Sequence, residues 1–400
     1  MTEHINTPEL RFPEFKDIWY IKQLEEIGAF KNGINKDKNS FGHGFPFVNL
    51  NNVFSSDNIN IDNLGLIDST KKERDEYNLL KGDTLFIRSS VKPSGVGLTK
   101  VVQNNLTDTI YSGFLIRFRE QKNFLEDNFK PYIFSSISTR RQIISLSSTS
   151  ANTNINQDSL KKVKITIPTL REQAKIGNFF SKLDRQIELE EKKLELLEQQ
   201  KKGYMQKIFS QELRFKDENG NEYPNWKNES LGDIAKITMG QSPSSKNYTE
   251  DSNYTILVQG NADLNNGYIK PRIYTKQVTK LAEVNDILLT VRAPVGKIGK
   301  AQLKACIGRG VCAIKGDNFI YYFLELFDLQ NKWIRFSQGS TFESISGNEI
   351  KNIDIAYPIN EERQKISEFL SKLDELLKNQ LLKVEQLKQR KHGLLQNMFV

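Results

Sequence analysis

The chain has 400 residues, a hydrophobic content of 38%, a charged fraction of 26% and a net charge of +8 at pH 7. This length allows two or three domains, and the composition is that of an ordinary soluble protein. The N-terminus lacks an apolar signal core and no run of about 18 apolar residues occurs, so we expect a cytoplasmic protein. The basic balance is compatible with a nucleic-acid partner and is weak support for one at this size.

Residue types that often build metal or nucleophile sites are few and scattered. Cys306 and Cys312 lie in one apolar pattern, which favours two buried thiols over a disulfide framework or a zinc site. His4, His43 and His392 are far apart, so we expect no histidine-based metal or nucleophile site. His43 fits a loop histidine without a chemical role.

Cofactor-binding motifs are also missing. The segment Ser94–Lys100, SGVGLTK, lacks the spacing of a phosphate-binding P-loop. Neither a Rossmann glycine fingerprint nor an Asn-Pro-Pro-aromatic methyltransferase tetrapeptide appears. Asp83 and Asp286 open apolar strands and fit turn or strand-entry residues better than metal ligands. We therefore expect no cofactor and no metal bound by this chain.

The chain is organised as two similar halves. Glu9-Leu-Arg-Phe12 returns as Glu212-Leu-Arg-Phe215, and Trp19 returns as Trp226. Each half reads as a globular region followed by a long helix, and the period is too long for a solenoid. The expected order is a lead-in at 1–15, a globular region at 16–167, a helix at 168–210, a linker at 211–225, a second globular region at 226–357 and a last helix at 358–400.

Both globular regions are predicted to mix short strands with helices. Apolar runs between Gly-, Asn- and Ser-rich turns predict the strands, and longer periodic runs predict the helices. In the first half we expect strands at 45–50, 84–88, 96–102, 114–118 and 160–167 and a helix at 123–144. In the second half we expect strands at 255–259, 287–291, 311–314 and 350–356 and a helix at 318–336.

Two polar loops occupy matching places in each half. One follows the strand that opens with Asp83 or Asp286, and the other precedes the last strand. Arg and Lys suit phosphates, Arg reads guanine edges and Asn or Gln reads adenine. The candidate DNA-binding residues are Arg88, Lys92, Arg140, Arg141 and Asn152, then Arg292, Lys297, Arg309, Arg335, Gln338 and Ser340. Each residue alone also fits a solvated surface group, so the signal lies in the two paired sets.

The two long helices align without a gap at a constant offset of 190 residues (358 − 168). Both contain Ser-Lys-Leu-Asp, at 181–184 and 371–374, and apolar residues at alternating steps of four and three indicate a coiled-coil seam. The seam residues, also candidates for partner docking, are Ile176, Phe180, Leu183, Ile187, Leu194 and Leu197, then Ile366, Leu370, Leu373, Leu377, Val384 and Leu387.

Polar residues interrupt this seam at Glu190 and Lys201, and at the equivalent Gln380 and Lys391. Shared interruptions at a shared register favour pairing of the two helices with each other. The alternative is that each helix packs separately on its own globular neighbour. A helix of roughly 39 residues is about 58 Å long, which exceeds one turn of DNA at about 3.4 Å per base pair. Spacer length is therefore a candidate ruler for two separated half-sites.

Taken together, these features resemble the DNA-specificity subunit of type I restriction–modification systems over nearly the whole chain. The resemblance rests on the duplicated layout, the ELRF…Trp openings, the Asp-led strand before each Arg loop and the paired SKLD helices. It also rests on two junctions between strand and helix, with Pro168, Glu172, Gln173, Lys175 and Ile176 in one and Pro358, Glu362, Gln364, Lys365 and Ile366 in the other.

The resemblance implies an α+β fold with two mixed α/β target-recognition domains separated by two long helices. These helices would form an antiparallel intramolecular coiled coil in a pseudo-twofold tandem repeat. Each domain would read one half of a bipartite double-stranded DNA target. The two regions share little sequence outside the common residues, so we expect two different half-sites.

The resemblance also implies partners. The coiled coil would dock two modification (methyltransferase) subunits, through which restriction–translocation subunits join. S-adenosylmethionine, ATP and Mg would then bind those partners, and this chain would be the non-catalytic subunit of a restriction endonuclease and adenine DNA methyltransferase complex.

Two other functions stay open at this point. One is a self-contained nuclease or methyltransferase with an unrecognised site. The other is a coiled-coil scaffold that binds only proteins and reads no bases.

Overall fold

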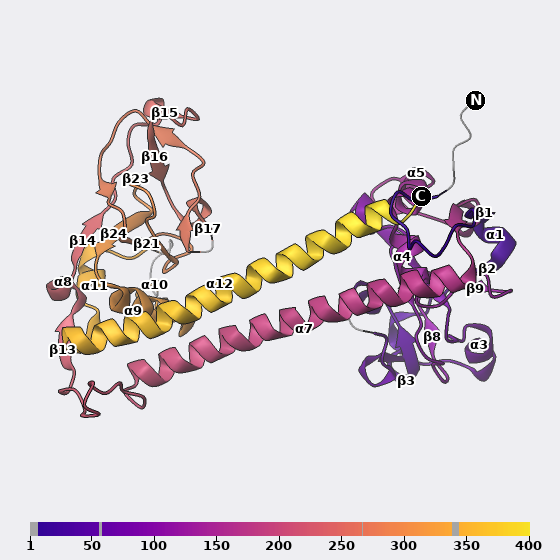
Figure 1. Ribbon diagram of the computed structural model, residues 1–400, viewed down its shortest axis with the longest axis horizontal. Coiled ribbons are helices and arrows are strands. Elements are labelled where there is room, and N and C mark those ends of the chain that lie inside the picture. The colour runs from indigo at the N-terminus through magenta and orange to yellow at the C-terminus, as the bar shows by residue number, and fades with distance from the viewer. Residues whose placement is uncertain (1–6, 56–57, 266, 338–343) are drawn as a thin grey trace. The chain divides into compact units, whose positions relative to one another are not determined.

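The computed structural model describes residues 7–55, 58–265, 267–337 and 344–400. The chain divides into two compact units: unit 1 comprises Met1–Glu191 with Leu382–Val400, and unit 2 comprises Lys192–Leu381. The long helices are α7 (Leu170–Phe209) and α12 (Asn360–Asn397) (Figure 1). Each helix is divided between the units, with one part in unit 1 and the other part in unit 2. Each unit thus contains one globular region and a portion of both helices.

Unit 1 contains two main sheets. The first is antiparallel with the strand order β2–β9–β5–β7, and the second has the order β4–β3–β8, in which β3 and β8 run parallel. The strands are β1 (Tyr20–Gln23), β2 (Gly28–Asn32), β3 (Phe41–Val48), β4 (Gly65–Ile67), β5 (Thr84–Ile87), β6 (Ser89–Ser90), β7 (Thr99–Val101), β8 (Ile110–Tyr111), β9 (Leu115–Glu120), β10 (Ser148–Thr149), β11 (Thr153–Asn154) and β12 (Lys164–Ile167). The short helices are α1 (Leu24–Ile27), α2 (Leu50–Phe54), α3 (Lys71–Glu76), α4 (Lys130–Ser135), α5 (Ile137–Ser145) and α6 (Gln157–Lys161), with a 3₁₀ turn η3 (Pro93–Gly95).

Unit 2 repeats this plan with longer sheets. Their orders are β14–β24–β21–β22–β18–β17 and β15–β19–β16–β23–β20. The strands are β13 (Lys227–Ser230), β14 (Lys236–Met239), β15 (Tyr248–Thr249), β16 (Thr255–Val258), β17 (Leu264–Asn265), β18 (Tyr268–Ile269), β19 (Tyr274–Thr275), β20 (Leu281–Ala282), β21 (Ile287–Thr290), β22 (Ile298–Lys300), β23 (Ala305–Ile307), β24 (Val311–Lys315) and β25 (Asp354–Tyr357). The short helices are α8 (Leu231–Ile234), α9 (Asn318–Leu329), α10 (Ile334–Ser337) and α11 (Gly347–Lys351).

The repeat predicted from the sequence is therefore a repeat of topology. The order β2–β9–β5–β7 of unit 1 matches β14–β24–β21–β22 of unit 2, and the parallel pair β3·β8 matches β16·β23. In both units the first strand pairs antiparallel with the strand that leads into a long helix, as β1 with β12 and β13 with β25. The predicted α+β fold with a tandem repeat is confirmed.

Several predicted elements have different limits. The single helix predicted at 123–144 is two helices, because Ser136 ends α4 and its hydroxyl accepts a hydrogen bond from the Thr139 N–H at the start of α5. The helix predicted at 318–336 likewise divides into α9 and α10. The last strand of each half begins later than predicted, since Asn156 and Ser346 cap the short helices α6 and α11.

Each Ser-Lys-Leu-Asp tetrapeptide anchors the globular region of its own unit. In unit 1 the Tyr132 hydroxyl donates a hydrogen bond of 2.8 Å to Asp184. In unit 2 the Tyr322 hydroxyl donates one of 2.7 Å to Asp374. The serine of each tetrapeptide lies 3.4 or 3.1 Å from the same hydroxyl. Burial raises the pKa of both phenols, so both stay protonated donors at neutral pH.

The same two aspartates form ion pairs with the lysines that interrupt the seam. Lys391 of α12 lies 2.5 Å from Asp184 of α7 in unit 1, and Lys201 of α7 lies 2.6 Å from Asp374 of α12 in unit 2. Unit 1 has two further ion pairs between these helices, Lys383–Glu190 and Lys388–Glu191, each 2.5 Å long. Partner numbers on α7 rise from 184 to 190 as those on α12 fall from 391 to 383, so within the unit the helices run antiparallel.

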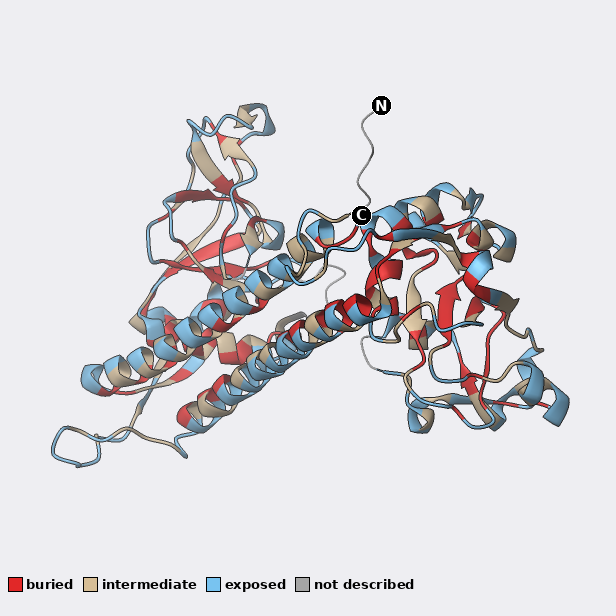
Figure 2. Ribbon diagram, turned by 45° about the vertical axis from the view of Figure 1, so that its right-hand side comes forward, coloured by how far each residue is buried: buried red, intermediate tan, exposed pale blue. Residues whose placement is uncertain are grey.

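The predicted seam faces inward. Ile176, Phe180, Ile366 and Leu370 are at most 1% exposed, and the other predicted seam residues are buried or half-buried. Figure 2 shows buried and intermediate stripes along both helices beside exposed faces. At the end of α12, Met398 joins the core of unit 1. The seam residues are thus in contact within the chain, and their role in partner docking stays a prediction.

The ELRF segments are fastened to the first turn of each long helix. The Arg11 guanidinium donates two hydrogen bonds of 2.7 Å to Glu172, and Arg214 donates bonds of 3.1 and 2.7 Å to Glu362. Both carboxylates are fully buried. The Leu10 N–H also donates to the Asn397 carbonyl at 2.8 Å. The part of the N-terminal segment around Leu10 and Arg11 is therefore anchored to both long helices within unit 1.

Lys201 of unit 2 pairs with two carboxylates, whereas Lys391 of unit 1 pairs with Asp184. Lys201 also lies 2.7 Å from Glu325 of α9, whereas the residue at the equivalent place in unit 1 is Ser135. Burial raises the pKa of Glu325, and the charge of Lys201 opposes this only in part. Burial would lower the pKa of Lys201, but Glu325 and Asp374 outweigh it, so its pKa is raised.

We predict that Lys201→Met destabilises unit 2 by about 2–3 kcal/mol at pH 8, because Glu325 is left without its cation. A carboxyl group with a raised folded-state pKa destabilises the fold above its unfolded pKa, near 4.5. The difference in unfolding free energy between wild type and variant should therefore shrink as pH falls toward about 5. Urea unfolding of the full chain at the two pH values measures it.

Lys391→Met is the matched control. Its partner Asp184 is 40% exposed, so the loss should be about 0–1 kcal/mol with little pH dependence. Equal losses from the two variants, or a Lys201→Met loss that grows on acidification, would contradict the role assigned to Glu325.

Candidate nucleic-acid interface

In unit 1 the two predicted polar loops meet at one end of the β5–β9 sheet. Ser89 and Ser90 of β6, which follow β5, pair with Asn154 and Thr153 of β11. The Ile155 N–H donates a hydrogen bond to the Arg88 carbonyl at 2.9 Å, and this bond continues the contact. Residues that are about 65 positions apart in the sequence thus form one surface, as the paired-loop interpretation required.

The predicted residues of this surface differ in how exposed their side chains are. The side chains of Lys92, Arg141 and Asn152 are exposed. Arg88 is half-buried, and its guanidinium donates a long hydrogen bond of 3.4 Å to the Gly113 carbonyl. Lys92 and Asn152 line the same surface pocket, whereas Arg141 projects from α5. Lys92 and Asn152 are therefore the best placed of these residues to meet a ligand.

Arg140 has a structural position instead. Its guanidinium donates hydrogen bonds of 2.9 and 2.7 Å to the carbonyls of Ser94 and Val96. Burial lowers the pKa of this arginine, and its Nη1 is enclosed without a hydrogen-bond partner among the described residues. In this structure the Arg140 side chain holds the loop at 93–97, and a direct DNA contact by Arg140 stays a prediction.

In unit 2 two arginines stand on neighbouring strands. The Val291 N–H donates a hydrogen bond to the Gly310 carbonyl at 2.9 Å, one step beyond the last β21–β24 pair, Thr290 with Val311. Arg292 and Arg309 therefore extend from the same end of the sheet, and both are exposed. Among the described residues neither guanidinium has an ion-pair partner. The structure thus brings together two cations that the sequence had placed in separate segments.

The other predicted residues of unit 2 are less free. Lys297 lies 3.0 Å from Asp328, which neutralises much of its charge. Arg335 lies over the rings of Phe327 and Phe336 at 5.1 and 4.8 Å. The predicted residues Gln338 and Ser340 lie outside the described residues.

Sequence reasoning missed several residues at this end of each unit. Phe114 and Val91 of unit 1 are exposed apolar side chains beside the predicted polar ones. In unit 2 the Ser242 hydroxyl accepts a hydrogen bond from the Arg309 N–H at 3.0 Å and so fixes the turn that presents Arg309. The Gly-Arg-Gly sequence at 308–310 was a usable signal for this turn, because glycines beside an arginine indicate a close backbone approach. In the structure a Cβ at Gly310 would collide with the Gln259 carbonyl.

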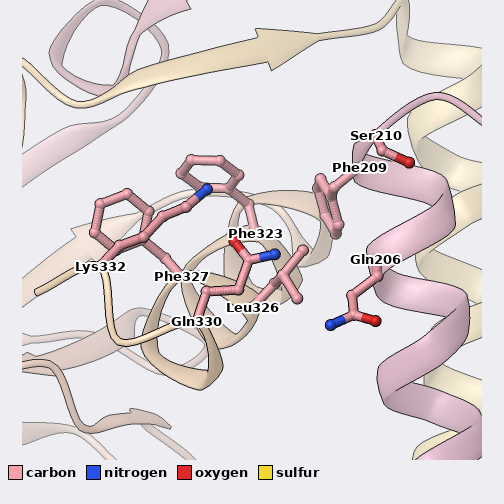
Figure 3. A pocket seen from close by; sticks show the side chains of 8 residues that line it. All are labelled: Gln206, Phe209, Ser210, Phe323, Leu326, Phe327, Gln330 and Lys332. Carbon is pink, nitrogen blue, oxygen red and sulfur yellow. The ribbon is translucent and has the colours of Figure 1, made fainter.

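A separate pocket of about 210 Å³ lies in unit 2 between the end of α7 and α9. Figure 3 shows the rings of Phe209, Phe323 and Phe327 around it, with Gln206, Gln330 and Lys332 at its margin. Its described lining contains one cation and lacks Asp, Glu, His and Cys. This lining offers no pair of groups for acid–base or nucleophilic chemistry.

Within the described part of the chain, no group of three or more His, Cys, Asp or Glu side chains is arranged to hold a metal ion. No helix in those same ranges is long and apolar enough to cross a bilayer.

Comparisons with known proteins agree with this layout. A relative from Methanocaldococcus jannaschii, the putative type I restriction enzyme MjaX specificity subunit, is 29% identical over 406 residues, covering 98% of this chain and 95% of that protein. The EcoKI specificity subunit of Escherichia coli K12 is 27% identical over 180 residues, covering 44% of this chain and 37% of that protein.

Two solved structures share the fold. A chain from a structural study of complex assembly and conformational transition in the type I R-M system aligns with a TM-score of 0.63 and 22% identity, covering 94% of this chain and 96% of that one. The type I S subunit of M. genitalium aligns with a TM-score of 0.60 and 17% identity, covering 98% and 99%.

The model of the type I restriction modification DNA specificity domain matches this chain twice, at residues 16–199 and 223–386. Each match takes in one globular region and part of a long helix, so the family repeat and the structural repeat coincide. The chain therefore belongs to the family of type I restriction modification DNA specificity proteins.

Proposed function

We propose that this chain is the DNA-recognition subunit of a type I restriction–modification complex and that each unit reads one half of a bipartite target. The observation that carries the proposal is the repeated placement of the loops. In both units the loop that follows one strand of the sheet contacts the turn that precedes the neighbouring strand. In unit 1 these strands are β5 and β9, and in unit 2 they are β21 and β24. Two copies of one reading surface suit a target written in two parts.

The exposed chemistry of the two surfaces differs, which supports an asymmetric target. Unit 1 presents Lys92 and Asn152 beside apolar side chains, whereas unit 2 presents Arg292 and Arg309. Lysine and arginine contact phosphates, while an arginine can also bind guanine through two hydrogen bonds. Two surfaces with different donors select different bases, so the two half-sites should differ.

The proposal extends to the rest of the complex. We assign methyl transfer to two modification subunits, and DNA cleavage with translocation to restriction subunits. S-adenosylmethionine, ATP and Mg would bind those partners. This chain would be non-catalytic, supplying sequence selection and a scaffold. The family match and the names of the relatives support this division of labour.

We predict that Arg309→Ala in the assembled methyltransferase complex relaxes base preference at one position in one half-site only. Loss of a bidentate arginine contact costs about 1–3 kcal/mol of discrimination. Mapping of methylated sites across the genome of cells that carry the variant reads out the change. Arg185→Ala, which removes an exposed arginine from α7, is the control and should leave the motif unchanged.

Relaxation in both half-sites would contradict separate reading by the two units. An unchanged motif would remove Arg309 from the reading surface. Equal methylation of all sequences by the wild-type complex would contradict sequence-specific recognition altogether.

We further propose that the long helices set the gap between half-sites. Inserting four residues after Glu191 in α7 and four after Leu381 in α12 leaves each unit's internal contacts in place, because these are the unit boundaries. At about 1.5 Å per residue the spacer grows by about 6 Å, and we predict a mapped gap longer by about two base pairs. An unchanged gap in an active complex would contradict the ruler.

A further inference from the structure

An apolar pocket opens on the reading surface of unit 1. It has a volume of about 590 Å³ and lies between α2, the loop after β5 and the turn before β9. The side chains that matter for its chemistry are Phe54, Val91, Lys92, Leu98, Phe114 and Asn152.

The apolar side chains of this pocket are unusually open to water. Val91 is 81% exposed, Phe114 is 55% exposed and Phe54 is 50% exposed. Large apolar groups gathered at one exposed place mark binding surfaces more often than single scattered ones do. The described lining contains Lys92 and no carboxylate. An apolar patch beside a cation fits a ligand that offers an apolar group next to a negative charge.

Unit 2 shows that the fold does not require this exposure. Its matching loop carries Val295, which is half-buried and packs on the core that contains Trp333. A Cβ on Gly296 would collide with the Trp333 ring, so the loop lies directly against that ring. The turn equivalent to the one at Phe114 carries Arg309 instead. Unit 1 alone leaves the apolar surface of this loop uncovered.

The pocket wall is held in shape before any ligand arrives. Arg140 donates hydrogen bonds to two carbonyls of the loop, those of Ser94 and Val96. Gly97 adopts a left-handed conformation with φ of +62°, which turns the chain back into the sheet. On the other side β6 pairs with β11. A preformed wall loses little conformational entropy on binding, which favours selective contact.

We propose that this pocket receives the 5-methyl group of a thymine in the half-target read by unit 1, an inference that rests on the proposed function. The thymine methyl is the one apolar group that the four standard bases present in the major groove. Val91 and Phe114 contact the methyl, and Lys92 binds a phosphate of the same strand. The contact selects thymine over cytosine, which lacks the methyl group.

Deoxyuridine substitution tests this proposal. It removes the methyl group and keeps every hydrogen-bonding edge of the base. The assembled methyltransferase complex is titrated with its mapped target duplex, in which each thymine is replaced in turn by deoxyuridine. We expect affinity to fall about three- to ten-fold at one or two positions, all within one half-site, and to stay unchanged at the others.

Substitution of a pocket residue tests whether the affinity lost with deoxyuridine arises in the pocket. Val91→Ser should bind the thymine duplex more weakly and should no longer distinguish thymine from deoxyuridine at those positions. Val284→Ser, which changes a 53% exposed valine of unit 2, is the matched control and should keep the full distinction.

Three outcomes decide the matter. Unchanged affinity with deoxyuridine at every position, in a complex that still rejects random DNA, overturns the pocket and leaves sequence reading intact. A deoxyuridine effect that persists in Val91→Ser places the methyl contact elsewhere and also overturns it. Equal affinity for target and random DNA overturns the proposed function itself.

Discussion

The lysines that interrupt the apolar seam, Lys201 and Lys391, each reach an aspartate of the opposite long helix. Those aspartates also accept hydrogen bonds from tyrosines of the globular regions. One carboxylate therefore joins three elements in each unit: α7, α12 and a helix beside the sheet. Such a contact forms only when the helices are antiparallel and in a single register. Apolar seams alone tolerate sliding, and polar contacts at fixed positions between the helices favour one register over the others.

Both units have this contact, but they differ in the charges around it and in the loops of the reading surface. Unit 2 adds Glu325 to its lysine–aspartate pair, whereas unit 1 has Ser135 there. Unit 1 leaves an apolar pocket open at its reading surface, and unit 2 fills the corresponding place with Trp333 and presents arginines. A shared scaffold with divergent loops lets the reading chemistry of one half change while pairing of the helices is preserved.

The sequence was most informative where a pattern repeats over many residues. Heptad spacing predicted α7 and α12, and the shared interruptions pointed to mutual pairing. The partners of those interruptions stayed hidden, because Tyr132 and Tyr322 come from elements far away in the sequence. Arg140 illustrates a related limit: its residue type indicates the chemistry that the side chain can perform, but the fold determines that its guanidinium donates to two loop carbonyls. Exposed apolar residues such as Val91 could not be predicted in this way, because an apolar residue in a loop does not reveal from the sequence whether it is buried or exposed.

Intramolecular antiparallel pairing is tested most directly by a distance between spin labels at Arg185→Cys of α7 and Arg390→Cys of α12. Both sites are exposed, and the native Cys306 and Cys312 are buried, with burial raising the pKa of Cys312 to about 12, so the native thiols should stay unlabelled. Helix axes about 10 Å apart predict one short distance that is unaffected by mixing with unlabelled chain. A long distance, or a short one lost on that dilution, would show that these two helices of one chain do not pair with each other.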